Sequence, residues 1–399
     1  MTTTINNEHK KLNVPNLRFP EFKGEWKKCI LGDITENFNL RNKDKIQYPM
    51  FSVTNDRGFV PQSEQFEGRD MVGEDIKAYK IIHTNDFAYN PARINVGSIA
   101  MYTGEKPCMI SSLYVCFKTT KEVNNEWLMQ LLKTPKMNYY YNVNGEGGVR
   151  VYLFYPNFAR IRMSIPKIEE QKKIAKLLNL IDERIATQNK IIDKLQSLIK
   201  GINQNVFTDD GFNYMLKELC EIRSGYSGNQ LASKNGLKVS RIETISGHKV
   251  NIERVGYVAP FASSENYKLQ IGDILFSNIN SVEYIGNTAF IEKDYGLYHG
   301  MNLLRLMPNK NIVTPLYLYL LLNINKMQNH FKTICNKAVS QASINQTELG
   351  KTVVKIPSIK AQKQICELYQ SLYNKLETED NAISLLQKQK EYLLRQMFI

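Results

Sequence analysis

The sequence predicts an α+β protein built as a tandem, pseudo-twofold duplication, in which a globular α/β domain followed by a long helix occurs twice. Three observations predict this architecture: a helical segment recurs without a gap, both copies have heptad spacing, and similar short β-rich runs and turns precede each copy. A repeat of this length determines the architecture, because each copy is expected to fold as the same structural unit.

The repeat is clearest between residues 165–207 and 356–398, which align at a constant offset of 191 residues. Of the 43 aligned positions 12 are identical, beginning with the Ile-Pro pairs at Ile165 and Ile356. Nearer the N-terminus the matching residues are 185 to 190 positions apart, which small insertions explain. The duplication is therefore expected to include both globular segments as well as both helices.

Both repeated segments have apolar residues in alternating steps of four and three, which is the heptad spacing of a coiled-coil seam. The seam residues are Ile174, Leu178, Ile181, Ile185, Gln188, Ile192 and Leu195 in the first copy, and Ile365, Leu372, Leu376, Glu379, Ile383, Leu386 and Leu393 in the second. Pro166 and Pro357 suit a helix start, where the missing N–H of proline costs little. A helix of about 38 residues would be about 57 Å long, which is typical of a spacer or an assembly surface.

Two like helices bury their seams best as an antiparallel pair about a pseudo-twofold axis. In that arrangement Gln188, in the middle of the first seam, would lie near its counterpart Glu379, and a buried polar contact there could fix the register. This pairing is a hypothesis. Two parallel helices, or helices packed on other chains, are alternatives that the sequence leaves open.

The repeat also sets the domain boundaries. The predicted segments are an N-terminal tail at 1–20, a first globular domain at 21–164, a central helix at 165–207, a second globular domain at 208–355 and a C-terminal helix at 356–399. The tail is polar, and we expect it to be loosely held. In the first domain a helical stretch at 126–140 is expected to break near Pro135, because proline lacks an N–H and its ring collides with the preceding turn.

The composition is that of a folded protein with excess positive charge. There are 52 Lys and Arg residues against 39 Asp and Glu, a formal net charge of +13, and the excess is spread over both domains and both helices. This favours a polyanionic partner. The six cysteines form no Cys-x-x-Cys pair, which predicts reduced thiols. The first residues lack the apolar core of a signal peptide and there is no run of 18 apolar residues, so we expect a cytoplasmic protein without a membrane partner.

The sequence contains little that indicates catalysis or metal binding. Gly350-Lys351-Thr352 imitates the end of a phosphate loop, but the first glycine of that motif is replaced by Asn345. There is no Gly-x-Ser-x-Gly motif, and the five histidines stand apart without ligand spacing. We therefore expect the chain to carry out no covalent chemistry and to bind no cofactor or metal itself.

Five stretches together resemble a known family. They are Trp-Lys-Lys-Cys-Ile-Leu-Gly-Asp-Ile at 26–34, the Ile-Pro-x-Ile-x-x-Gln-Lys-x-Ile starts at 165 and 356, the lead-in at 14–22, and the Gly-Gly-Val-Arg loop at 147–150. With the duplicated helices, they make the sequence similar to the DNA-specificity subunit of type I restriction-modification enzymes. The resemblance covers essentially the whole chain.

The resemblance implies that each globular domain is a target-recognition domain that reads one half of a bipartite site in double-stranded DNA. It implies that the helices form an antiparallel coiled coil, which separates the two halves and docks two modification (methyltransferase) subunits. Those subunits would bind S-adenosylmethionine and methylate adenine, and two restriction subunits would use ATP and Mg. The chain itself would be non-catalytic. The alternative is a coiled-coil assembly scaffold that does not bind DNA.

Nine residues are candidates for DNA contact. Among such residues, Arg suits guanine while Asn and Gln suit adenine in the major groove. The nine candidates are Asn90, Arg93, Arg150 and Tyr152 in the first domain, and Asn278, Asn280, Lys337, Ser340 and Gln341 in the second. Arg150 follows Gly148, where backbone freedom permits close approach to a phosphate. Gln341 matches Arg150 at offset 191, which suits two domains that read different bases. A simple turn is the alternative at Asn90-Pro91.

Overall fold

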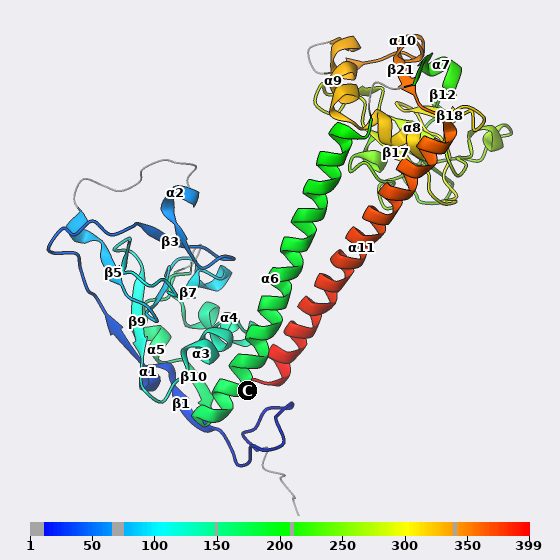
Figure 1. The fold of residues 1–399 in the computed structure, drawn as a ribbon. Helices are drawn as coiled ribbons and strands as arrows, with labels where there is room; N and C mark the ends of the chain where they lie inside the picture. The colour runs from blue at the N-terminus through cyan, green and yellow to red at the C-terminus, as the bar shows by residue number, and fades with distance from the viewer. Residues whose placement is uncertain (1–11, 66–75, 148–150, 208–210, 338–340) are drawn as a thin grey trace, which may run out of the picture. The chain divides into compact units, whose positions relative to one another are not determined.

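The computed structural model describes residues 12–65, 76–147, 151–207, 211–337 and 341–399 (Figure 1). The chain divides into two compact units: unit 1 comprises residues 1–189 and 381–399, and unit 2 comprises residues 190–380. Each unit contains one globular domain, the near half of one long helix and the far half of the other. No helix in the described part of the chain is long and apolar enough to cross a membrane.

Unit 1 is built around a four-stranded antiparallel sheet with the strand order β2-β9-β6-β7. The elements before its long helix are β1 (Lys27–Ile30), α1 (Leu31–Ile34), β2 (Thr35–Phe38), β3 (Phe51–Val53), β4 (Phe59–Pro61), α2 (Gln62–Gln65), η1 (Ile76–Ala78), β5 (Lys80–Ile82), β6 (Phe87–Tyr89), η2 (Ile94–Val96), β7 (Ile99–Met101), β8 (Cys108–Ile110), β9 (Val115–Thr119), α3 (Asn125–Leu132), α4 (Pro135–Asn144), α5 (Tyr155–Ala159) and β10 (Arg162–Ile165). Three further antiparallel pairs are β1-β10, β3-β4 and β5-β8.

Unit 2 repeats this plan, with a four-stranded sheet in the order β12-β18-β15-β17. Its elements are β11 (Phe212–Met215), α7 (Leu216–Leu219), β12 (Cys220–Ser224), β13 (Leu237–Val239), η3 (Ile242–Ile245), β14 (Gly256–Val258), η4 (Ser264–Tyr267), β15 (Ile274–Phe276), β16 (Ile279–Asn280), β17 (Thr288–Phe290), β18 (Leu304–Pro308), α8 (Pro315–Leu322), α9 (Asn325–Ile334), β19 (Asn336–Lys337), β20 (Ala342–Ser343), α10 (Gln346–Gly350) and β21 (Val353–Ile356). The two four-stranded sheets match strand for strand, and β11-β21 matches β1-β10. The predicted α+β duplication is therefore confirmed.

The predicted break in the helical stretch of the first domain is also confirmed. Helix α3 ends at Leu132 and α4 begins at Pro135. The hydroxyl of Thr134 accepts a hydrogen bond from the backbone N–H of Met137 at 3.2 Å, so Thr134 caps the second helix. Proline in the first turn of a helix loses no helical hydrogen bond, which explains why the chain restarts there.

The long helices are α6 (Ile168–Asn205) and α11 (Ile359–Gln396), each of 38 residues. The expectation that Pro166 and Pro357 open them is wrong by two residues. In the first copy β10 runs to Ile165, and the carbonyl of Lys167 is the first to accept helical hydrogen bonds, from the backbone N–H groups of Glu170 and Gln171 at 3.0 Å. Pro166 therefore belongs to the link between strand and helix.

A buried glutamine explains the repeated Gln-Lys at the start of each long helix. The side-chain Nε2 of Gln171 donates to the carbonyls of Pro166 at 2.9 Å and Glu122 at 3.0 Å, and its Oε1 accepts from the N–H of Asn124 at 2.8 Å. Gln362 makes the equivalent set with Pro357, Ile312 and Thr314. Both side chains are buried. Each glutamine thus joins the start of a long helix to the loop before α3 or α8.

Replacement of Gln171 by Leu should destabilise unit 1 by about 3 kcal/mol, because a buried backbone donor and two carbonyls lose their partner. Gln362→Leu should do the same to unit 2. Gln196→Leu is the matched control, since Gln196 is identical in the repeat but exposed, and it should change stability little. Denaturant unfolding measures each effect. Equal stability of Gln171→Leu and Gln196→Leu would refute this role.

Within unit 1 the end of α11 packs antiparallel on the start of α6. The Nζ of Lys390 lies 2.5 Å from Oδ1 of Asp182. Met397 and Phe398, which directly follow α11, join the core that contains Ile174, eight residues before Asp182. Residue numbers therefore rise along one helix as they fall along the other.

Unit 2 contains the equivalent pairing. The hydroxyl of Tyr369 on α11 hydrogen-bonds Oδ1 of Asn203 on α6. The Phe207 ring lies 6.1 Å from that of Tyr369 and 5.5 Å from that of Tyr317. Phe207 and Phe398 match at offset 191, so each unit completes its core with the far end of the other repeat's helix.

The predicted seam faces inward. Ile174, Leu178, Ile181, Ile192, Leu393 and Glu379 are buried, and Ile185, Gln188, Leu195, Ile365, Leu372, Leu376, Ile383 and Leu386 are half-buried. Glu379 is ion-paired with Lys375, one turn earlier on its own helix. Gln188 belongs to unit 1 and Glu379 to unit 2, so their contact stays a prediction.

The N-terminal segment makes tertiary contacts from Asn13 onward, which contradicts the expectation of a loosely held tail for residues 13–20. The guanidinium of Arg18 makes two hydrogen bonds, of 2.7 and 2.8 Å, to the carboxylate of Glu170. Trp26 Nε1 donates to the same carboxylate at 3.3 Å, and the N–H of Leu17 donates to the carbonyl of Gln396 at 2.9 Å. A buried carboxylate needs such partners, and Glu170 is only 1% exposed.

Candidate nucleic-acid interface

In unit 1 the candidate residues Asn90 and Arg93 lie on a tight turn after the buried strand β6. The Oδ1 of Asn90 accepts a hydrogen bond from the N–H of Ala92 at 3.0 Å, and its carbonyl accepts from the N–H of Arg93 at 3.0 Å. Asn90 is half-buried and Arg93 is exposed. The Asn90 side chain thus helps to form the turn, which agrees with the simple turn given as the alternative at Asn90-Pro91. Arg93 remains at the surface.

The loop with Tyr152 lies beside this turn. Tyr152 and Glu146 exchange two backbone hydrogen bonds of 2.8 Å, and the N–H of Leu153 donates to the carbonyl of Pro91 at 3.0 Å. The structure therefore brings Tyr152 together with the Asn90–Arg93 turn. Arg150 lies outside the described residues.

Two exposed aromatic residues flank the buried Leu153 in the sequence. Tyr152 is 38% exposed and Phe154 is 49% exposed. Their rings are stacked, with centroids 6.3 Å apart and an interplanar angle of 12°. Phe154 is not among the residues predicted from the sequence, although its two-residue spacing from Tyr152 is the signal that places both side chains on one face of an extended chain.

In unit 2 two of the five candidate residues lie in a small three-stranded sheet with the order β16-β20-β19, and Asn278 and Gln341 flank it. Asn280 on β16 and Lys337 on β19 both pair with Ala342 on β20. Gln341, directly before that strand, is exposed, as is Lys337. Ser340 lies outside the described residues.

Asn278 and Asn280 are held by local contacts. The N–H of Ile344 donates to the carbonyl of Asn278 at 2.9 Å, and the Oδ1 of Asn278 is buried without a partner among the described residues. The Nδ2 of Asn280 donates to the hydroxyl of Ser277 at 3.1 Å, and its Oδ1 accepts from the N–H of Ser281 at 2.8 Å. Both asparagines are half-buried.

The two candidate surfaces use the same scaffold. The link from Leu153 to Pro91 in unit 1 has its equivalent in the link from Ile344 to Asn278 in unit 2, at offsets of 191 and 187 residues. The match of Gln341 with Arg150 stays a sequence correspondence. Each unit thus presents different side chains on one shared backbone arrangement.

A buried aspartate supports each arrangement from the other end of the strand. Asp86 precedes β6 and accepts from the N–H of His83 at 2.8 Å, and Asp273 precedes β15 and accepts from the N–H of Gln270 at 2.7 Å. Burial raises the pKa of both carboxyls, and these donors oppose that rise. The short turns fix where β6 and β15 begin, and therefore where the candidate turns lie.

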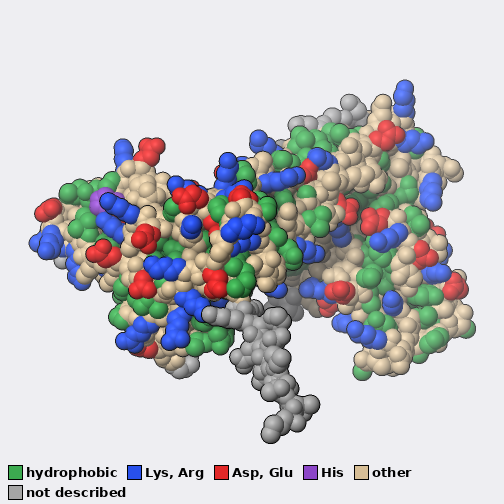
Figure 2. Space-filling model, turned by 90° about the horizontal axis from the view of Figure 1, so that it is seen from below, with side chains coloured by type: hydrophobic (Ala, Val, Ile, Leu, Met, Phe, Trp, Pro, Cys, Tyr) green, Lys and Arg blue, Asp and Glu red, His purple; other side chains and the backbone are tan. Residues whose placement is uncertain are grey.

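Positive charge is distributed rather than concentrated. Figure 2 shows Lys and Arg side chains interspersed with acidic and apolar ones over the face in view. This agrees with the even spread of charge along the sequence. Any contact with a polyanion would therefore depend on individual cations near the candidate loops.

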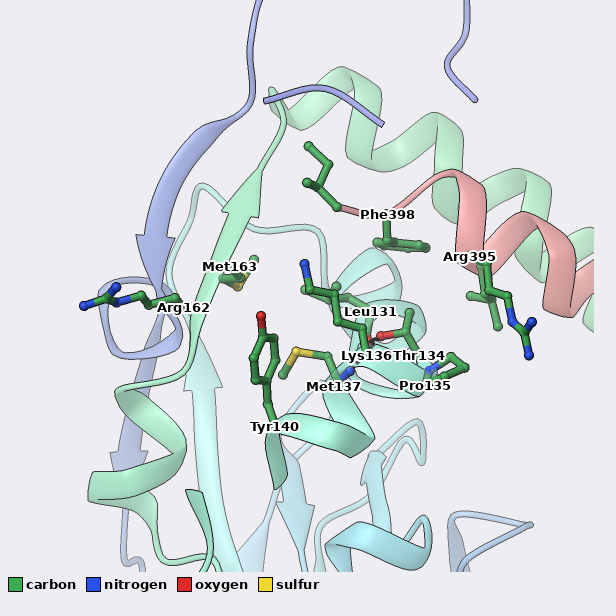
Figure 3. A pocket seen from close by; sticks show the side chains of 12 residues that line it. Leu131, Thr134, Pro135, Lys136, Met137, Tyr140, Arg162, Met163, Arg395 and Phe398 are labelled. Atoms are coloured by element: carbon green, nitrogen blue, oxygen red, sulfur yellow. Dashed lines mark hydrogen bonds between the residues drawn. The ribbon is translucent and has the colours of Figure 1, made fainter. Parts of the chain in front are cut away.

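A pocket of about 140 Å³ lies in unit 1 beside α4, β10 and the end of α11 (Figure 3). Leu131, Met137 and Phe398 contribute apolar surface, and Lys136 and Arg395 contribute cations. Its volume is enough for about one apolar side chain. The pocket is therefore a feature of the surface where the helix pair meets the first domain.

The fold and these surfaces define a class of protein with duplicated binding domains carried on a paired helix. The sequence matches the type I restriction modification DNA specificity domain twice, over residues 23–197 and 211–388. The chain therefore belongs to this family.

Two relatives come from Methanocaldococcus jannaschii. A protein provisionally named the MjaX type I restriction enzyme specificity subunit is 43% identical over 187 residues, which cover 46% of this chain and 44% of that relative. The MjaVIII type I restriction enzyme specificity subunit is 25% identical over 342 residues, which cover 78% of this chain and 76% of that relative. This chain thus covers less than half of the first relative.

The fold agrees with solved structures over nearly the whole chain. The S subunit of a type I restriction-modification system from M. genitalium superposes with a TM-score of 0.60 at 14% identity, covering 97% of this chain and 99% of that one. The HsdS subunit from Thermoanaerobacter tengcongensis gives a TM-score of 0.50 at 16% identity, covering 94% and 96%. At these identities the likeness concerns the fold.

Proposed function

We propose that this chain is the sequence-specific DNA-binding subunit of a type I restriction-modification complex, and that each globular domain reads one half of a bipartite target. The observation that carries the proposal is the shared backbone arrangement of the two candidate surfaces, which presents different side chains in the two units. Two domains that use one scaffold with different side chains are what the reading of two different half-sites requires.

The described residues suit a division of labour between phosphate and base contacts. Lys337 is exposed on an edge strand, where its charge can reach a phosphate. Arg93 can donate two parallel hydrogen bonds to guanine, and the amide of Gln341 can pair with adenine. In unit 1 the Tyr152–Phe154 pair adds an apolar surface beside the turn.

The partners in this proposal are double-stranded DNA, two modification subunits and two restriction subunits, in the cytoplasm. The helix pair would dock the modification subunits, and the pocket at the end of α11 lies on that surface. S-adenosylmethionine would be bound by the modification subunits, and ATP and Mg by the restriction subunits. The chain would supply the address only. A scaffold without DNA contact is not favoured, because it gives no role to two folded basic domains.

Methylome sequencing of a host that expresses this chain with and without its modification subunit tests the proposal. A methyladenine pattern in two short blocks with a fixed gap is expected only when both are present. In vitro, the affinity of the complex for target DNA should fall steeply as salt rises. A stable complex that yields no new methylation would leave the scaffold alternative in front.

The exposed aromatic pair gives a residue-level prediction. Double replacement of Tyr152 and Phe154 by Ala should weaken target binding about tenfold or more, because contact between an aromatic ring and a base is worth about 1–3 kcal/mol. Fluorescence anisotropy with labelled duplex measures the change. Phe212→Ala is a matched control, because Phe212 is also exposed but lies outside the candidate loops. Equal affinities of the two variants would exclude the pair from the interface.

A further inference from the structure

A polar pocket in unit 2 lies outside the surfaces described above. It has a volume of about 490 Å³ and lies between β12, β18 and η4. Apart from Ile222 and the ring of Tyr267 its lining is polar, and it includes Arg223, Arg305, His299 and Asn266. The family match and the candidate DNA contacts give this pocket no role.

The duplicated sequence shows that the fold does not need these polar residues. Arg223 on β12 pairs directly with Arg305 on β18. The equivalent cross-strand pair in unit 1, at offsets of 185 and 189, is Phe38 with Cys116. His299 corresponds to Ile110 at offset 189. These three residues of unit 1 belong to a single apolar cluster.

Burying an arginine in place of an apolar residue costs free energy unless the guanidinium is fully paired. Arg305 is 5% exposed. One terminal nitrogen lies 2.6 Å from Oδ2 of Asp273, and the other donates to the carbonyl of Asn266 at 3.4 Å. Its Nε is buried and has no hydrogen-bond partner among the described residues. The guanidinium of Arg305 is therefore not fully paired within the described residues.

The positive charge of the pocket comes from the two arginines, and Glu221 contributes one negative charge to the lining. Burial lowers the pKa of His299 to about 4, and its Nε2 donates to the carbonyl of Leu303 at 2.9 Å, so the ring is neutral near pH 7. Arg223 is ion-paired with Glu221 at 2.6 Å, but both side chains are half exposed. Such exposed pairs contribute little stability, so Arg223 can exchange Glu221 for another anion.

We propose that this pocket binds a phosphate group, with Arg305 and Arg223 as the charged donors and Ser263 and Asn266 as neutral donors. A planar guanidinium matches the geometry of phosphate oxygens, and two arginines on adjacent strands can approach one group from the same face. Asp273 keeps Arg305 in place when the pocket is empty, and Glu221 competes with the ligand for Arg223. The phosphate could come from the DNA backbone or from a free nucleotide.

Calorimetric titration of the full-length chain with inorganic phosphate, at constant ionic strength with chloride as the reference, tests the site. Saturable binding is expected, with Kd raised at least tenfold by Arg223→Gln and binding lost in Arg305→Gln. Lys351→Gln is the matched control, because Lys351 forms a comparable exposed ion pair with Glu348 at 2.8 Å, away from the pocket. If Arg305→Gln fails to fold, Arg223→Gln still decides. No saturable heat, or equal Kd in Arg223→Gln and Lys351→Gln, overturns the proposal.

The salt dependence of DNA binding identifies the source of the phosphate, and this arm rests on the proposed function. If the group belongs to the DNA backbone, Arg223→Gln should reduce the slope of log K against log salt by about 0.9, the value for one phosphate. An unchanged slope with intact phosphate binding assigns the pocket to a free nucleotide. Phosphate binding without DNA binding would contradict the proposed function and keep the pocket. DNA binding without phosphate binding would support the proposed function and refute the phosphate site.

Discussion

Replacing residues 27–165 with a copy of residues 212–356 is expected to yield a complex that methylates two copies of the same half-site. In both segments the first strand pairs with the last one. Lys27 lies opposite Ile165, and Phe212 lies opposite Ile356. The graft therefore enters and leaves at matching points. Methylome sequencing should show one block of the original target replaced and the other retained.

The core of unit 1 can accept the graft because the repeat conserves the contacts with the long helices. Phe398 packs on Trp127 with ring centroids 5.9 Å apart, and the equivalent Phe207 packs on Tyr317 at 5.5 Å. The grafted copy of Tyr317 would meet Phe398 as the original meets Phe207. The new domain should therefore fold on the old helices.

The orientation of the two half-sites in the methylated target can contradict this prediction. A pseudo-twofold relation between the domains predicts an inverted repeat, because duplex DNA has dyad symmetry. A direct repeat would contradict that relation, and an unchanged first block would contradict the assignment of half-sites to domains. As a control, Gln341→Ala should alter one block in the original chain. In the grafted chain the same change in both copies should alter both blocks.

The elements that sequence reasoning predicted well depend on local rules. Heptad spacing, the repeat and the break near Pro135 need only neighbouring residues to be interpreted. The exact start of α6 was missed because it depends on where β10 ends, and that depends on pairing with β1, which is distant in the sequence. Local patterns thus specified the architecture but not the register of its parts.

The missed features share a dependence on distant contacts. Arg18 pairs with Glu170 across 152 residues, and Gln171 binds the loop before α3 across 47 and 49 residues. Arg223 and Arg305 look unremarkable along the chain, and only their strand pairing places them side by side. The shared backbone scaffold of the candidate surfaces likewise emerged from long-range hydrogen bonds.

Replacing Phe398 with Ala should destabilise unit 1 by about 3–4 kcal/mol and leave unit 2 nearly unchanged, as expected for a large-to-small change in a core. Phe398 is 8% exposed and belongs to the core whose other buried members lie mostly between Trp26 and Ile181. Hydrogen exchange measured by mass spectrometry should show lost protection in β6 and β9 but not in β15 and β18. Phe207→Ala should give the reverse pattern.

We expect this selectivity because the core of each unit includes residues from the end of the long helix that belongs to the other repeat. The last residues of the chain therefore contribute to the stability of its first domain, and residues near 207 contribute to that of the second. Tyr392→Ala is the matched control, because Tyr392 lies on the same helix end but is 59% exposed, so protection should be unchanged. If Phe398→Ala weakened both units equally, the two cores would unfold as one. Protection lost in unit 1 alone would instead show that each helix end stabilises one recognition domain separately.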